Sequence, residues 1–232
     1  MTSKRSHSRK RPTETRRLRL PPDENRRRLI EALASSIEQN GYRRTSVADI
    51  VRIARTSRRT FYEHFEDRDA CFLALFDAAN EQMMQRIAAR VRSDAPWSEQ
   101  VDMAINAYLD DIAERPALFK SFARELSALG EAGDSRARAA VERIATLLIT
   151  LVEYSRREHP DVIAHPLSFE MAVVIVAGLR ELTVAALEED ADFTPLRATV
   201  SEIVKTILNA AVLSPESPSS RRPVTDTGHE HR

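Results

Sequence analysis

The chain contains little cysteine, glycine or aromatic residue, and it has no long apolar run. Cys71 is its only cysteine among 232 residues, so no disulfide can form within the chain. Glycine occurs five times and aromatic residues make up 6%. The abundant alanine, leucine, arginine and glutamate favour helix. No apolar stretch approaches the roughly 20 residues that span a bilayer, and the N-terminal residues lack the apolar core of a secretory signal. These features predict an all-helical cytoplasmic protein.

Charge is unevenly distributed, although the formal net charge is zero. Residues 1–20 contain eight basic residues and one acidic residue, a net charge of +7, which leaves −7 for the rest of the chain. This basic front indicates contact with a polyanion near the N-terminus. It is either an arm that follows the phosphates or minor groove of DNA or a tail that only aids solubility.

Apolar residues recur at helical spacing through the middle of the chain. Residues 1–22 and 214–232 are polar and rich in proline or serine, which predicts disordered tails. Between them, residues 23–68 are expected to form one domain and residues 69–213 a second. About nine helices are predicted, with a loop at 130–135. They span about 24–40, Ser46 to the link at Arg55 and Thr56, Ser57–Phe65, 67–92, 97–114, 116–129, 136–158, 167–189 and 195–213.

The first three predicted helices form a DNA-reading pattern. The link between the second and third helices is short, as in a helix-turn-helix. In that motif the later helix, here the third, enters the major groove. Phe61 and Phe65 are four residues apart and are expected in the core. Arg58, Arg59 and Tyr62 then face elsewhere, where arginine can pair bidentately with guanine. The alternative is an ordinary solvated helix face.

Two segments give this pattern a family resemblance. Thr45–Ile50 (TSVADI), followed by Thr60–Arg68 (TFYEHFEDR), resembles the signature of the TetR family over about residues 26–76. The resemblance implies a homodimeric transcriptional regulator with an N-terminal helix-turn-helix and a C-terminal helical domain for ligand binding and dimerisation. It further implies a repressor released from a palindromic operator by a small hydrophobic effector. Arg55 and Arg59 depart from the family, which often has glycine at both positions.

The resemblance also assigns residues to the DNA interface. Ser46 would cap its helix and reach a phosphate, and Arg68 would contact another phosphate at the start of the fourth helix. His64 could contact DNA or simply cap or pack. The full expected set is Ser46, Ser57, Arg58, Arg59, Thr60, Tyr62, His64 and Arg68.

In the C-terminal domain, the resemblance places an effector pocket among the fifth to seventh helices and a dimer interface on the eighth and ninth. The broad apolar surface of residues 167–189 independently indicates burial on more than one side. The candidate pocket residues, each of which could instead be ordinary core, are Met103, Tyr108, Phe119, Phe122, Tyr154 and Phe169. The candidate interface residues are Met171, Ile175, Gly178, Leu182, Val200, Val204 and Ile207.

The sequence offers no catalytic pattern. It contains neither a glycine-rich phosphate loop nor a Gly-x-Ser-x-Gly elbow. His159 and His165 lack the tight helical spacing of a zinc site, and His229 and His231 fall in the polar tail. We therefore expect no enzyme, no metal and no cofactor. The main alternative to a ligand-responsive regulator is a dimeric architectural DNA-binding protein without an effector, and a small helical enzyme or carrier is a weaker one.

Overall fold

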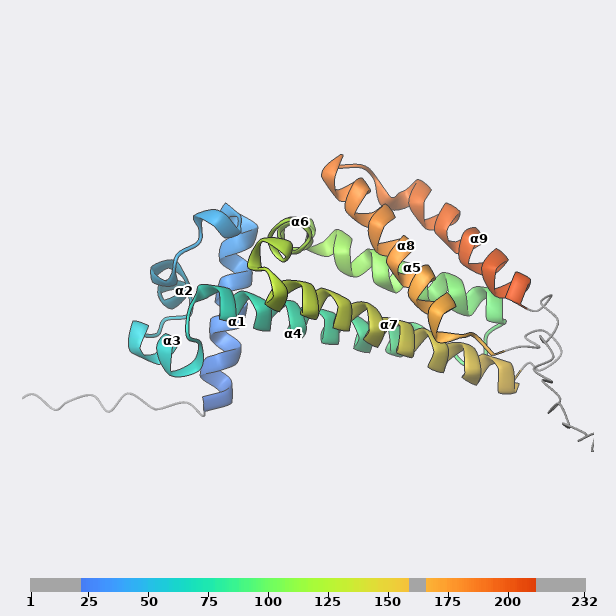
Figure 1. The fold of residues 1–232 in the computed structure, drawn as a ribbon, viewed down its shortest axis with the longest axis horizontal. Coiled ribbons are helices and arrows are strands. Elements are labelled where there is room, and N and C mark those ends of the chain that lie inside the picture. The colour runs from blue at the N-terminus through green and yellow to red at the C-terminus, as the bar shows by residue number, and fades with distance from the viewer. Residues whose placement is uncertain (1–21, 159–165, 212–232) are drawn as a thin grey trace, which may run out of the picture. The chain divides into compact units, whose positions relative to one another are not determined.

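The computed structural model of the chain describes residues 22–158 and 166–211 (Figure 1). These residues form nine α-helices and two short 3-10 helices and contain no strand, which confirms the predicted all-α class. The elements are α1 (Pro22–Asn40), η1 (Tyr42–Arg44), α2 (Val47–Ile53), α3 (Arg58–His64), α4 (Arg68–Arg90), α5 (Trp97–Glu114), α6 (Pro116–Glu125), η2 (Ser127–Leu129), α7 (Glu131–Glu158), α8 (Phe169–Glu188) and α9 (Phe193–Ala211). Apart from Pro22, the predicted disordered tails, together with His159 and His165, lie outside the described residues.

The chain divides into two compact units, one ending at Phe72 and the other beginning at Leu73. The first holds α1, η1, α2, α3 and the first residues of α4, and the second holds the rest of α4 and all later helices. Helix α4 therefore belongs to both units. No helix in the described ranges is long and apolar enough to cross a membrane.

The first unit is built around the apolar face of α1. Leu29, Leu33 and Ile37 recur every four residues and are completely buried, together with Ile50 of α2 and Phe61 of α3. Such spacing places the three α1 side chains on one stripe of the helix. Helix α1 contacts both α2 and α3, so this stripe fixes where the two shorter helices lie.

The end of α1 follows the sequence pattern. The helix stops at Asn40, and the Gly41 amide closes the last turn on the Ile37 carbonyl at 2.7 Å. Gly41 has a φ of 76°, a conformation that glycine adopts without steric cost. The short helix η1 that follows was not predicted. Its Tyr42 side chain is buried against Phe72, with ring centroids 4.1 Å apart.

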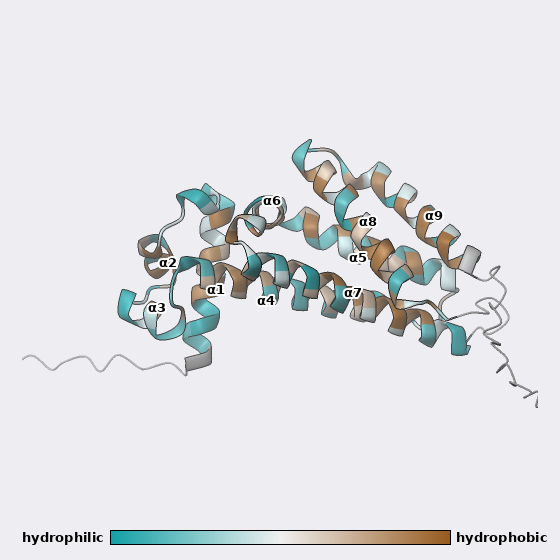
Figure 2. Ribbon diagram, viewed as in Figure 1, coloured by the Kyte–Doolittle hydropathy of each residue, from teal (hydrophilic) through white to brown (hydrophobic). Residues whose placement is uncertain are grey.

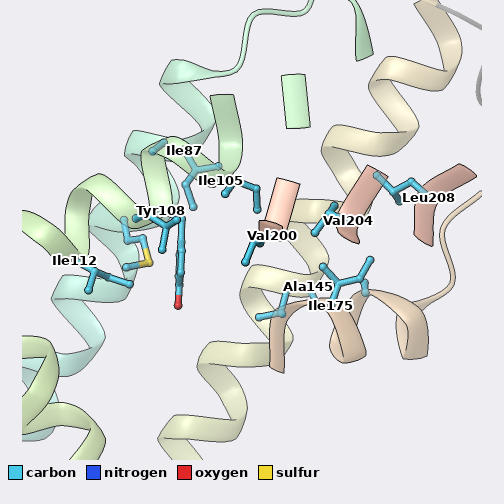
Figure 3. Close-up of a cluster of buried hydrophobic side chains, with 14 of the residues drawn as sticks. Ile87, Ile105, Tyr108, Ile112, Ala145, Ile175, Val200, Val204 and Leu208 are labelled. Atoms are coloured by element: carbon cyan, nitrogen blue, oxygen red, sulfur yellow. The ribbon is translucent and has the colours of Figure 1, made fainter. Parts of the chain in front are cut away.

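The second unit has its own apolar core. Figure 3 shows side chains from α4, α5, α7, α8 and α9 meeting there, among them Ile87, Tyr108, Ala145, Ile175 and Val204. Helix α7 packs on α8, and α5 packs on α9. Two ion pairs reinforce the second contact: Lys205 with Asp102 at 2.9 Å and Arg197 with Asp110 at 2.7 Å.

Helix α7 begins earlier than the sequence predicts. Residues 130–135 (GEAGDS) have loop composition, but α7 starts at Glu131 and includes five of them. Gly133 explains the difference, because a Cβ atom there would lie 1.9 Å from the Leu126 carbonyl oxygen. This glycine therefore lets the first turn of α7 approach the backbone just before η2. The predicted helix 116–129 is likewise divided, with α6 ending at Glu125 and η2 following it.

Candidate nucleic-acid interface and ligand pocket

Ser46 caps helix α2, as expected, and does so through a capping box with Asp49. The Ser46 hydroxyl oxygen accepts from the Asp49 amide at 3.3 Å, and the Asp49 carboxylate accepts from the Ser46 amide at 3.1 Å. The Ser46 hydroxyl also donates to that carboxylate at 2.6 Å. These bonds from Ser46 hold the pKa of Asp49 below its usual value. Ser46 is exposed at the start of α2, and its hydroxyl holds the first turn together.

The link between α2 and α3 contains a residue in a left-handed conformation. Arg55 has a φ of 53°, and the Thr56 amide closes the turn on the Val51 carbonyl at 2.9 Å. The Arg28 side chain of α1 donates to the Ala54 carbonyl. The turn therefore needs a positive φ at the position where Arg55 replaces glycine, and it is held from both sides by hydrogen bonds.

Helix α3 separates an anchoring face from an open face. Phe61 and Phe65 are buried, as predicted, with ring centroids 5.7 Å apart. Arg58, Arg59 and Tyr62 are exposed, with 58% of Tyr62 accessible. The structure therefore brings the three side chains onto the accessible surface of one short helix, and the aromatic pair fixes the rotation of that helix on the core.

The remaining polar residues of α3 mainly support the helix. Ser57 caps it by accepting from the Thr60 amide at 3.1 Å, and the two hydroxyls are 2.9 Å apart. Arg59 pairs with Glu63 one turn along at 3.1 Å. His64 is half-buried in the last turn. An acidic partner thus shares the open face with Arg59.

The structure directs Arg68 toward the interior of its own unit. Its Nη1 donates to the Thr45 carbonyl at 2.9 Å, and its guanidinium carbon lies 4.2 Å from the centre of the Tyr42 ring. The Tyr42 hydroxyl in turn donates to Asp69. Cation–π stacking and a backbone carbonyl give the Arg68 guanidinium a positioning role within the first unit, and its expected phosphate contact stays a prediction.

A cavity of about 90 Å³ lies within the second unit, between α4, α5, α6, α7 and α8. Of the residues expected from sequence, Tyr108, Phe119 and Phe122 line it. The rest of the lining is Phe76, Asn80, Met83, Ile112, Ala123, Leu126, Ala137, Ala140, Val141, Ile144, Val176, Arg180, Thr183, Val184 and Leu187.

The other three candidate pocket residues do not line this cavity. Tyr154 on α7 is 51% exposed and Phe169 in the first turn of α8 is 44% exposed, so both side chains point outward. Met103 of α5 is half-buried outside the lining. Sequence reasoning missed the polar lining residues Asn80, Arg180 and Thr183. The spacing of these three residues did not indicate that they face a cavity, because each lies in a helix whose periodicity is set by its apolar residues.

The candidate interface residues of α8 and α9 divide into two groups. Ile175, Val200 and Val204 are buried in the chain's own core, which corrects their assignment to a partner-facing surface. Met171, Gly178 and Leu182 are exposed, and Ile207 is half-buried. Two exposed residues were missed: Val174, which is 62% accessible, and Ile203, which is 45% accessible. Both continue a helical stripe at spacings of three or four from residues already selected.

Taken together, the capped α2, the tight turn and the exposed face of α3 define a DNA-binding helix-turn-helix. A comparison with known families agrees: the model described as bacterial regulatory proteins, tetR family, matches residues 29–75. Residues 29–75 therefore form a DNA-binding segment of the tetR type, and the chain is a DNA-binding transcriptional regulator.

Three proteins that match most of the chain share less than a quarter of their residues with it. A helix-turn-helix-type transcriptional regulator of Haemophilus influenzae is 22% identical over 170 residues, covering 72% of this chain and 82% of that protein. The regulator FadR of Bacillus subtilis, solved in complex with stearoyl-CoA, is 19% identical with a TM-score of 0.64 and covers 80% of this chain and 98% of that one. The fatty acid degradation regulator FadR of Bacillus halodurans is 18% identical with a TM-score of 0.61 and covers 78% and 94%. These structural likenesses establish a shared fold.

Proposed function

We propose that the protein is a homodimeric repressor that binds a palindromic operator through α3 and leaves it when a small apolar molecule occupies the second unit. The observation that supports DNA binding is that α3 has one buried face and one exposed face. Two buried phenylalanines anchor the helix while Arg58, Arg59 and Tyr62 remain open to solvent. Arginine and tyrosine suit a groove lined with acceptors.

Each side chain takes a distinct part in this proposal. Arg58 and Arg59 read base edges or phosphates from the leading turns of α3, and Tyr62 contacts the backbone or a base one turn later. The exposed caps Ser46 and Ser57 stand at helix starts, where amide groups and the helix dipole favour a phosphate. Thr60 and the half-buried His64 border the same surface and make secondary contacts.

The proposed homodimer forms through α8 and α9. Met171, Val174 and Leu182 give α8 an exposed apolar stripe, and Ile203 is an exposed apolar residue of α9. Large apolar side chains gathered on an open surface mark an interaction site. Figure 2 shows the high apolar content of both helices. A twofold-symmetric dimer presents two copies of α3 to half-sites about one duplex turn apart.

Helix α4 supplies the covalent link for release, because its residues belong to both units. A ligand that shifts the helices around the cavity would bias the spacing of the two recognition helices. It acts only through its different affinity for the DNA-bound and released arrangements. The cavity favours this reading over an architectural protein without an effector, since such a protein needs only a closely packed core. The stearoyl-CoA complex of the Bacillus subtilis relative lends support to an apolar effector.

The direct experiment is footprinting of the purified protein on DNA flanking its own gene, with excess competitor and at several salt concentrations. We expect protection of a short palindrome that an Arg59→Ala, Tyr62→Ala double variant loses. Arg143→Ala, on the exposed surface of α7, removes one positive charge without touching α3 and should leave the footprint intact. Equal loss in both variants would contradict the role of α3. Only diffuse, strongly salt-dependent binding would favour the architectural alternative.

A further inference from the structure

The residues that line the cavity in the second unit include one with a formal charge. Its lining includes four polar residues, Asn80, Tyr108, Arg180 and Thr183, and no acidic residue. The other lining side chains are apolar. Within the described part of the chain, the Arg180 guanidinium makes no ion pair or hydrogen bond, in contrast to Arg197 and Lys205 of α9. A pocket whose single charge is an uncompensated guanidinium selects for an anion.

The neutral polar groups of the cavity already have partners that orient them. Asn80 is buried, and its amide donates to the Phe76 carbonyl at 2.8 Å, which leaves its second N–H for a ligand. The Thr183 hydroxyl donates to the Leu179 carbonyl at 2.7 Å and shares a hydrogen bond with Tyr108. Burial raises the pKa of Tyr108 to about 12, so the phenol stays neutral at physiological pH. Arg180 is exposed and stands at the rim, whereas Tyr108 lies inside.

A second cavity adjoins the first one. It holds about 70 Å³ and shares Tyr108, Ile144 and Val176 with the first cavity as common walls. Apart from Tyr108, every residue of its lining is aliphatic, from Ile87 of α4 to Val204 of α9. Figure 3 shows Tyr108 projecting from α5 into the unit, beside the side chains that bound this second space. The polar groups are therefore confined to one end of a longer apolar interior.

We propose that the two cavities together bind an aliphatic carboxylate, with its carboxylate at Arg180 and its hydrocarbon chain passing Tyr108 into the second cavity. The proposal rests on the proposed function, since it names the effector class of the same pocket. A carboxylate matches the planar fork of the guanidinium, and the second N–H of Asn80 provides a further donor. An aliphatic chain matches a lining that offers no hydrogen-bond partner.

The test measures binding of hexadecanoate and its methyl ester to the full chain by calorimetry, without DNA. We expect the acid to bind about tenfold or more tightly than the ester, the usual advantage of a hydrogen bond to a charged group. Arg180→Gln keeps much of the aliphatic stem and should remove this advantage, whereas Arg180→Lys should retain part of it. Glu181→Gln, a neighbouring exposed residue outside the cavity lining, is the matched control and should change neither affinity.

Chain length tests the second cavity. Hexadecanoate should bind more tightly than octanoate, by up to about fourfold for each additional buried methylene until the space is filled. Ala104→Leu fills part of the second cavity and should weaken hexadecanoate much more than octanoate. Equal affinity of acid and ester, or an undiminished acid preference in Arg180→Gln, would overturn the proposal.

Operator binding is measured separately, so that the two proposals can fail separately. If the ester binds as tightly as the acid and releases DNA, the carboxylate assignment is wrong and the effector function stands. If the acid binds through Arg180 but operator affinity is unchanged, the ligand class stands and release by an effector is wrong.

Discussion

Arg68 lies over the ring of Tyr42, with its guanidinium carbon 4.2 Å from the ring centre and its Nη1 2.9 Å from the Thr45 carbonyl oxygen. The first residue of α4 thereby holds both η1 and the segment that leads into the cap of α2. Tyr42 contacts Asp69 through its hydroxyl and Phe72 through its ring. The start of α4 and the entry to the helix-turn-helix are therefore one connected structure within the first unit.

The first prediction is that Arg68→Ala destabilises this unit rather than weakening a phosphate contact. Loss of the stack and of the charged hydrogen bond should lower the free energy of opening of α1–α3 by about 1–3 kcal/mol. Amide hydrogen exchange of the first unit measures this change.

Salt dependence of DNA binding separates the two roles of Arg68. A lost phosphate contact lowers the slope of log K against log salt by about one unit. If Arg58 or Arg59 contacts a phosphate, its replacement by alanine should lower the slope in this way. We expect no such reduction of the slope for Arg68→Ala. Arg68→Lys keeps the charge but not the planar fork and should resemble the alanine variant in stability. A reduced slope for Arg68→Ala with unchanged stability would restore the phosphate role.

Features encoded by neighbouring residues were predictable from sequence. The Ser46–Asp49 capping box, the stop of α1 at Gly41 and the buried pair Phe61 and Phe65 depend on side chains within a few positions of one another. Local chemistry decides such features, so a single sequence contains the information.

Features decided by distant neighbours were not predictable. Gly133 lies in a helical turn that approaches the Leu126 backbone closely, and loop composition hid that contact. Arg68 turns inward because η1, which was not predicted, places Tyr42 beneath it. Helix α8 is apolar on several sides, so its periodicity could not tell Ile175, which faces the core, from Val174, which faces out.

The second prediction concerns the strained turn before α3. Arg55 has a φ of 53°, and a left-handed conformation costs a residue with a Cβ atom about 1–2 kcal/mol. Glycine relieves this strain but loses about 0.5–1 kcal/mol of backbone entropy on folding. Arg55→Gly should therefore stabilise the first unit by about 0.5–1 kcal/mol. Chemical denaturation measures the change. Arg55→Ala retains the Cβ atom and is the control, which should show no comparable gain; destabilisation by glycine would contradict the strain argument.

The third prediction concerns the single cysteine. Cys71 is completely buried, and this burial raises the pKa of its thiol from 9.0 to about 12. Because the thiolate is the reactive form, the native protein should resist iodoacetamide at about pH 8 and react only when unfolded. Rapid labelling of the native protein would show that α4 opens around Cys71.

The same shift gives a pH dependence of definite sign. The folded state holds the Cys71 proton more tightly than the unfolded chain, and Tyr108 is shifted in the same direction. Their contribution to stability is thus complete below about pH 9, the unfolded value of the thiol, and is lost as the pH rises through the folded values near 12. The free energy of unfolding should fall above pH 9, and Cys71→Ala should make that fall shallower.

The fourth prediction tests the proposed dimer through the exposed stripe of α8. Val174 is 62% and Leu182 44% accessible, although both are large apolar residues on one face of a helix whose opposite face is buried. In a twofold-symmetric dimer, Val174→Glu and Leu182→Glu would each place two negative charges, one from each copy, in the proposed interface. Burial of unpaired charge is strongly unfavourable. Light scattering should show a dimer for the natural chain and a monomer for the double variant. Glu170→Gln, exposed in the first turn of α8, should remain dimeric. Because both substitutions point away from the core, the monomer should keep its helical content while its operator affinity falls steeply. A folded double variant that is still dimeric would move the interface away from this stripe.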